Sequence, residues 1–231
     1  MNNNSVNVFD SSAGVYDEMI KKGMVLPGSD HAYFEQYKMH YLRPYLTQCR
    51  KLLDYGCGIG RFSQVVQECY PQMVIHGYDV SKESIAVVSP ELLHGENKFV
   101  STRDELDFDY DVVLLITVLH HVALDERLDV IRDAVSRLKP GGVLIVIEHN
   151  MRNFLTKRSV DACPLDDSAL MLRFEESHKL ISSVCPNVSS RYIVFWPKQL
   201  RFMRFMDGLL SKVPFGAQYM IVAKKASPVR G

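Results

Sequence analysis

Residues 51–62 read Lys51-Leu-Leu-Asp-Tyr-Gly-Cys-Gly-Ile-Gly-Arg-Phe62, and this stretch decides the fold. An apolar strand runs to Asp54, three alternating glycines follow, and a helical pattern opens at Phe62. Glycine has no Cβ and accepts positive φ, so the backbone of such a turn can lie directly against a ligand. The stretch therefore predicts a strand over 51–55, a helix over 62–69 and a cofactor on the turn between them.

The spacing of the glycines separates two kinds of cofactor. A dinucleotide fingerprint reads G-x-G-x-x-G, with its third glycine three residues past the second. Arg61 occupies that position here, and the third glycine comes one residue early, at Gly60. The turn therefore favours a smaller nucleoside cofactor without a pyrophosphate and argues against a dehydrogenase.

Composition and charge point to one soluble α/β domain. The 231 residues suffice for one well-cored domain with additions and are cramped for two. The chain has 27 basic residues (lysine and arginine) and 27 acidic residues (aspartate and glutamate), so its formal net charge is zero. This balance gives no reason to expect binding to nucleic acid or to an anionic membrane. Five scattered cysteines form no C-x-x-C pair, residues 1–5 lack the features of a signal peptide, and no apolar run reaches the roughly 18 residues that cross a bilayer. We expect a cytoplasmic protein.

Strands and helices alternate beyond the glycine turn. The near-continuous apolar run over 111–117 is typical of a central strand covered on both faces. The Lys-Pro-Gly-Gly stretch over 139–142 is expected to end a helix. The remaining expected strands are 74–78, 98–101, 143–148, 191–195 and 219–223, and the expected helices lie within 15–48 and over 84–88, 125–138 and 175–184. Such alternation predicts a parallel, doubly wound sheet, to which the last two strands add an antiparallel pair.

Several motifs, in order, resemble those of class I S-adenosylmethionine-dependent methyltransferases. The turn over 54–60 resembles motif I, Asp79 closes the second strand where the family keeps an acid, and 138–144 resembles the turn before the fifth strand. The segments 148–150, 162–170 and 216–219 are similar to a bacterial small-molecule subgroup associated with saccharide and secondary-metabolite pathways. The resemblance implies a Rossmann-like, seven-stranded, mostly parallel sheet with an antiparallel C-terminal edge strand. It also implies a helical cap over the cofactor (1–48) and a catalytic domain (49–231) with insertions near 151–173 and 196–216.

The resemblance also implies how S-adenosylmethionine is held and S-adenosylhomocysteine released. Asp54 would face the amino group, the backbone at Gly56 and Gly58 would approach the cofactor, and Asp79 would accept the ribose hydroxyls. An acid that commonly meets the adenine amino group is replaced by Thr102 and Arg103, so either Asp104 or backbone alone takes that role. The other expected cofactor contacts are Tyr33, Tyr37, Phe62, Val80 and Thr117.

Ionisable residues at the ends of the fourth and fifth strands are the candidates for the acceptor side. His120 and His121 follow one strand, and Glu148 and His149 close the next. A histidine with a pKa near neutrality is a competent general base for a hydroxyl or amine. We take His121, Glu148 and His149 as the candidate catalytic residues, with Glu148 either touching substrate or orienting a histidine. No set of residues shows metal-ligand spacing, so no metal is expected.

The sequence therefore predicts transfer of a methyl group to an oxygen or nitrogen of a small-molecule acceptor. Two alternatives stay open: a methyltransferase acting on a peptide carboxylate or RNA, and a methyltransferase-like fold that binds the cofactor without turnover and serves a partner. A basic and aromatic mixture over 191–212 could mark nucleic acid, but zero net charge does not favour it. The acceptor and the oligomeric state cannot be read from the sequence.

Overall fold

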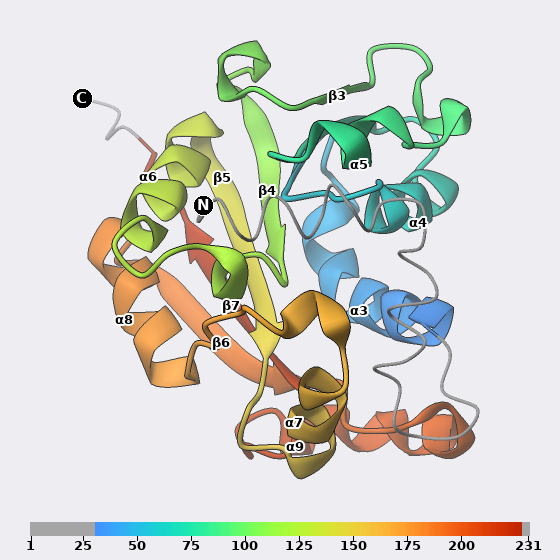
Figure 1. Ribbon diagram of the computed structural model, residues 1–231, viewed down its shortest axis with the longest axis vertical. Coiled ribbons are helices and arrows are strands. Elements are labelled where there is room, and N and C mark those ends of the chain that lie inside the picture. Colours follow the sequence, from blue (N-terminus) through green and yellow to red (C-terminus); the bar gives the residue numbers. More distant parts are fainter. Residues whose placement is uncertain (1–30, 228–231) are drawn as a thin grey trace.

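A computed structural model describes residues 31–227 as a three-layer α/β structure (Figure 1). A seven-stranded sheet with the order β3-β2-β1-β4-β5-β7-β6 lies between two layers of helices. Its strands are β1 (Lys51–Tyr55), β2 (Val74–Tyr78), β3 (Lys98–Val100), β4 (Tyr110–Ile116), β5 (Leu138–His149), β6 (Val188–Ile193) and β7 (Gln218–Lys224). Strands β1 to β5 run parallel, and β7 pairs antiparallel with both β5 and β6. The predicted fold is confirmed, with β7 inserted beside β5 and β6 forming the outer edge.

The helices bury one apolar face each on opposite sides of the sheet. On one side, α6 (Arg127–Arg137) and α8 (Phe174–Val184) contribute to a core that includes Leu53 of β1 and Val146 of β5. On the other side, α3 (His31–Leu46) and α4 (Arg61–Cys69) pack on a core that includes Leu52 and Ile145. Adjacent strand residues point to opposite faces, which is why neighbours such as 52 and 53 enter different cores.

Short elements connect these layers. They are α5 (Lys82–Ala86), α7 (Phe154–Asp161) and α9 (Asp207–Leu210), with 3₁₀ turns η1 (Pro90–Leu92), η2 (Arg103–Glu105), η3 (Leu119–His121), η4 (Pro164–Asp166) and η5 (Lys198–Met206). Within the described residues, no helix is long and apolar enough to span a bilayer. The five cysteines are all free. The part of the expected N-terminal cap that precedes α3 lies outside the described residues.

Three stretches contain structure that the sequence did not predict. Helix α6 ends at Arg137, just before the Lys-Pro-Gly-Gly stretch as expected, but that stretch lies within β5, which begins at Leu138. The register of β5 with β4 shifts between the pairs Tyr110–Leu138 and Val112–Val143. The expected insertion near 151–173 contains helix α7, which Asn153 caps by accepting the backbone N–H of Thr156. The expected insertion near 196–216 contains η5 and α9, and Phe202 and Phe205 of η5 are exposed.

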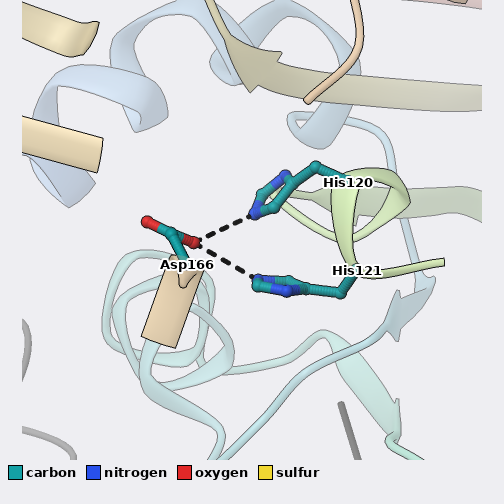
Figure 2. Close-up of side chains that lie close together, drawn as sticks. All are labelled: His120, His121 and Asp166. Atoms are coloured by element: carbon teal, nitrogen blue, oxygen red, sulfur yellow. Dashed lines mark ion pairs between the residues drawn. The ribbon is translucent and has the colours of Figure 1, made fainter. Parts of the chain in front are cut away.

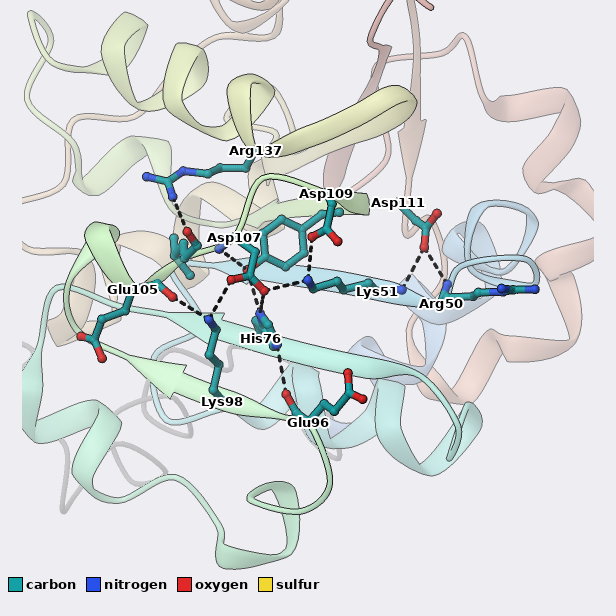
Figure 3. Close-up of polar contacts among 12 residues, drawn as sticks. Arg50, Lys51, His76, Glu96, Lys98, Glu105, Asp107, Asp109, Asp111 and Arg137 are labelled. Atoms are coloured by element: carbon teal, nitrogen blue, oxygen red, sulfur yellow. Dashed lines mark hydrogen bonds and ion pairs between the residues drawn. The ribbon is translucent and has the colours of Figure 1, made fainter.

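Charged side chains tie the amino-terminal ends of the strands together (Figure 3). Lys51, at the start of β1, forms ion pairs with Asp107 (2.7 Å) and Asp109 (2.6 Å). Lys98, at the start of β3, reaches Asp107 at 3.1 Å, and Asp111 of β4 accepts the backbone N–H groups of residues 50 and 51. This network belongs to the sheet edge opposite the glycine turn and stabilises the strand order.

The carboxyl-terminal edge of the sheet holds the candidate site. The chain moves outward from β1 through β2 to β3 and then returns to β4 on the other side of β1. Ligands of open α/β sheets bind beyond the carboxyl ends of the strands at such a reversal. The glycine turn after β1 and the histidines after β4 flank this point.

Candidate active site

The glycine turn has a different constraint at each of its glycines. Gly56, Gly58 and Gly60 all have positive φ, at 84°, 52° and 80°. A Cβ at Gly56 would collide with the side chain of Val118, whereas a Cβ at Gly58 would meet nothing within 4 Å. Gly56 is therefore needed for packing against the segment after β4, and Gly58 leaves a backbone surface open to a ligand.

Two carboxylates flank this open backbone. Asp54 is buried and accepts the hydroxyl hydrogen of Ser63 at 2.7 Å. Asp79 is half-buried, and its Oδ2 and Oδ1 accept the backbone N–H groups of Gly58 (2.8 Å) and Ser81 (3.0 Å). Burial, reinforced by the negative charges of Glu35 and Asp79, raises the pKa of Asp54 to about 6. A cationic amino group beside Asp54 would favour its ionised form and reverse this shift.

Helix α3 supplies a buried ion pair next to Asp54 that the sequence did not reveal. The Lys38 Nζ lies 3.2 Å from the Glu35 carboxylate, and both side chains are about 7% exposed. The same Nζ lies 5.4 Å from the ring centre of Phe62, the second residue of α4. A lysine on an amphipathic helix is ordinarily exposed, so only the packing of α3 on α4 places this cation near the turn.

The tyrosines of α3 anchor the C-terminal segment. Tyr37 is fully buried, and its hydroxyl donates to the carboxylate of Asp207, which also accepts the hydroxyl of Tyr41. Tyr33 donates to the backbone carbonyl of Trp196 at 2.9 Å. The structure therefore places Tyr37 in an anchor between α3 and α9, where its hydroxyl is occupied and its ring is covered.

The remaining expected cofactor residues lie along the same sheet edge. Val80 follows β2 and packs on the core of the α6 side. The Thr102 hydroxyl donates to Glu105, and the Arg103 guanidinium lies 5.9 Å from each of the rings of Tyr55 and Tyr78. The side chains of Thr102 and Arg103 therefore contact residues of η2 and of the neighbouring strands β1 and β2.

Thr117 joins β4 to the histidine-bearing turn in a strained conformation. Its φ is 55°, which a β-branched residue rarely adopts. Its backbone N–H donates to the carbonyl of Ile147 at 2.8 Å, so the neighbouring strand β5 holds it in place. Strain of this kind, which costs on the order of 1–3 kcal/mol, concentrates at functional sites.

Beyond Thr117, buried ionisable groups form a chain from β5 through η3 to η4. The Oε1 of Glu148 accepts the backbone N–H groups of Val118 (3.1 Å) and Leu119 (2.8 Å), and its Oε2 lies 2.5 Å from Nδ1 of His120. The other ring nitrogen of His120 lies 3.4 Å from Oδ1 of Asp166. Figure 2 shows that this oxygen also faces Nε2 of His121, at 3.5 Å.

The charges of this chain differ from one histidine to the next. Burial lowers the pKa of His120, but the carboxylates of Glu148 and Asp166 outweigh it and raise the pKa to about 9. Burial and the positive charge of His120 lower the pKa of His149 to about 4, and the same causes hold the pKa of His121 well below its usual range. At neutral pH, His120 is therefore a cation between two carboxylates, flanked by two neutral imidazoles.

The structure assigns different positions to the three expected catalytic residues. Glu148 is buried and its oxygens are occupied by His120 and two backbone groups, so it positions His120 instead of facing a ligand. His121 and His149 are partly exposed, and both rings lie beside that of His120, with centres 4.1 and 5.4 Å from it. Asp166 completes the cluster, and no sequence pattern predicted a role for it, because it lies in a segment without periodicity.

Comparison with known proteins agrees with this geometry. A protein-family model described as a methyltransferase domain matches residues 53–144. The curated O-methyltransferase 3 of Dictyostelium discoideum is 24% identical over 120 residues, which are 47% of this chain and 28% of that relative. The chain thus spans little more than a quarter of that relative's length.

Solved structures share the fold over nearly the whole chain. A SAM-dependent methyltransferase of Thermotoga maritima, described as a possible histamine N-methyltransferase, superposes with a TM-score of 0.67 at 17% identity, covering 96% of this chain and 99% of that one. The plantazolicin methyltransferase BpumL in complex with SAH gives 0.60 at 13% identity, covering 95% and 90%. Residues 53–144 match a methyltransferase domain, and the chain has the fold of the class I S-adenosylmethionine-dependent methyltransferases.

The residues present fit the cofactor of that class. The open backbone at Gly58 and the carboxylates of Asp54 and Asp79 on either side provide a surface and two acceptors for an amino group and hydroxyls. Backbone at the ends of parallel strands is where an α/β sheet accepts such a ligand.

Proposed function

We propose that the protein catalyses methyl transfer to an oxygen or nitrogen of a small-molecule acceptor, of the saccharide or secondary-metabolite kind. One observation carries the proposal: the open glycine turn between Asp54 and Asp79 shares a sheet edge with the partly exposed, neutral His121 and His149. S-adenosylmethionine supplies, when bound, an electrophilic methyl group on a sulfonium. The protein's task is then to hold two partners in line and to remove one proton.

The donor half would be held by residues of β1, β2 and the turn. Asp54 would accept the amino group, Asp79 the ribose hydroxyls, and Gly56 and Gly58 would present backbone. Val80 would pack on the adenine, and Thr102, Arg103 or the adjoining backbone would border it. Phe62, Tyr33 and Thr117 would line the remaining walls of this half.

The acceptor half would be organised by the buried chain. Glu148 holds His120 as a cation, and this cation keeps the neighbouring His121 and His149 neutral. A neutral imidazole accepts the proton of a hydroxyl or an amine, which is the general-base role that such an acceptor requires. His121 and His149 are the proposed bases, and Glu148 is a positioning residue.

Size and surface support a small acceptor in a cytoplasmic setting. The net charge is zero, the described cysteines are free, and described helices include no membrane span. Among the proteins that share this fold are a plantazolicin methyltransferase and a pyocyanin biosynthetic protein. The alternatives of a peptide carboxylate, RNA or a non-catalytic partner remain as outcomes of the test below.

The test is release of S-adenosylhomocysteine across sugar, amine and carboxylate acceptors. We expect turnover with a hydroxyl or amine, and a kcat for His121→Ala and His149→Ala lower by at least about 100-fold, the lower end of the usual contribution of a general base. His94→Ala, at an exposed histidine, is the matched control. A carboxylate acceptor needs no base, so unchanged activity of both variants would favour that alternative. Cofactor binding without turnover on any acceptor would favour the non-catalytic one.

A further inference from the structure

Three potential metal ligands converge at the end of the buried chain (Figure 2). They are Nε2 of His120, Nε2 of His121 and a carboxylate oxygen of Asp166, and all lie within 4.8 Å of one another. The two histidines come from η3 after β4, and the aspartate comes from η4. A hydrogen bond of 2.7 Å from the backbone N–H of Leu170 to the carbonyl of His120 ties these two segments together.

Two of the three distances between these atoms resemble the edges of a coordination polyhedron more than hydrogen bonds. Asp166 Oδ1 lies 3.4 Å from one Nε2 and 3.5 Å from the other. An N–H···O hydrogen bond is usually 2.7–3.2 Å long. Ligands at about 2.0–2.1 Å from a tetrahedral Zn²⁺ lie roughly 3.4 Å from one another.

The surroundings of His120 also resemble those of a metal-binding histidine. A metal-binding histidine ordinarily donates its other ring N–H to a carboxylate, which fixes the ring and the tautomer. Glu148 accepts from Nδ1 of His120 at 2.5 Å and is itself held by two backbone N–H groups. The His120 side chain is 1% exposed, whereas those of His121 and Asp166 are each 10% exposed, so the cluster is covered on one side and reachable on the other.

We propose that His120, His121 and Asp166 bind one divalent transition-metal ion, with Zn²⁺ as the reference ion, and leave a fourth position for an oxygen of the acceptor. Two imidazoles and one carboxylate with an open position form the ligand set of a catalytic zinc centre. Binding at Nε2 of His120 displaces its proton to solvent, and the charge of the ion then takes the place of the His120 cation. Because the ion also occupies Nε2 of His121, His149 remains as the base of the metal-loaded protein. The use of the fourth position by an acceptor rests on the proposed function, whereas binding of the metal does not.

The experiment measures Zn²⁺ binding by the full chain after dialysis against a chelator. We expect one Zn²⁺ per chain by metal analysis and calorimetry, and a visible spectrum typical of tetrahedral coordination when Co²⁺ replaces it. His121→Ala and Asp166→Ala should each weaken Zn²⁺ at least about 100-fold, and Glu148→Gln should weaken it by the 10- to 100-fold usual for an outer carboxylate. His94→Ala, which alters an exposed histidine, should bind as the wild type does.

Calorimetry with S-adenosylmethionine on the same variants separates a lost ligand from a lost fold. We expect His121→Ala and Asp166→Ala to keep the cofactor affinity, and Asp79→Ala to lose cofactor affinity but keep Zn²⁺. If His121→Ala loses both ligands, Asp166→Asn, which keeps the volume, replaces it as the test. A wild type that retains no stoichiometric Zn²⁺, or folded variants that bind it undiminished, would overturn the proposal. Zn²⁺ binding without cofactor binding would leave the metal site standing and defeat the proposed function instead.

Discussion

The two halves of the candidate site are built in opposite ways. The donor half consists of backbone in a glycine turn and two carboxylates at the ends of adjacent strands, all within residues 54–79. The acceptor half is a chain of buried ionised side chains from β5, η3 and η4, whose charges hold one another in place. A carboxylate of the first half should therefore matter for binding, and one of the second half for stability.

The largest expected effect follows from removing Glu148. Glu148→Ala leaves the His120 cation with only one carboxylate beside it. It also leaves the backbone N–H groups of Val118 and Leu119 without an acceptor. Breaking a buried pair from one side costs about 3–5 kcal/mol, so the free energy of unfolding in urea should fall by that amount. Glu68→Ala, at an exposed glutamate, should change it by less than about 0.5 kcal/mol. A loss no larger than that of the control would show that the chain is not structural.

Asp54 provides the contrasting substitution in the donor half. Its folded pKa of about 6 lies above its ordinary value, so its ionised form opposes folding. This opposition grows as the pH rises from the ordinary pKa to about 6 and is constant above that pH. At pH 7, Asp54→Asn should leave the free energy of unfolding equal to or above that of the wild type. The same variant should bind S-adenosylmethionine more weakly. If it is as unstable as Glu148→Ala, the two halves do not differ in the way described.

The pH dependence of cofactor affinity should follow the same carboxyl group. Asp54 must be ionised to accept an ammonium, so affinity should be full above about pH 6 and weaken towards tenfold per pH unit below it. Calorimetry between pH 4.5 and 7 in buffers of different ionisation enthalpy would also detect the proton that binding releases. In Asp54→Asn the slope should disappear. An unchanged slope in that variant would assign the titration to another group.

The smallest expected effect separates two glycines of the turn. Gly58→Ala meets open space and carries only the cost of its positive φ, about 1–2 kcal/mol. Gly56→Ala carries a similar cost and also collides with Val118, so its melting temperature should be the lower of the two. Gly58→Ala should nevertheless weaken cofactor binding, because its methyl group would occupy the open backbone surface. Equal melting temperatures would contradict the packing role of Gly56.

The donor half could be predicted from the sequence more fully than the acceptor half. Local signals fixed β1, α4 and β2 to within a residue, and the order of strands and helices was enough to expect the sheet. Histidines 120 and 121 could be placed at the same edge as Glu148, because parallel strands end together. Asp166, the partner of both histidines, could not be placed from the sequence, since it reaches them only through a loop anchored by Leu170. Likewise, the burial of Lys38 depends on how α3 packs, which no local pattern encodes.

The most direct test of the cofactor site is calorimetry of S-adenosylmethionine with the wild type, Asp79→Ala and the control Asp129→Ala, which changes an exposed aspartate. We expect binding to the wild type and the control, and an affinity of Asp79→Ala that is lower by roughly 10- to 100-fold, because charge-assisted hydrogen bonds contribute about 1.5–3 kcal/mol. Absence of binding to the wild type, or undiminished binding to Asp79→Ala, would contradict this assignment of the cofactor site.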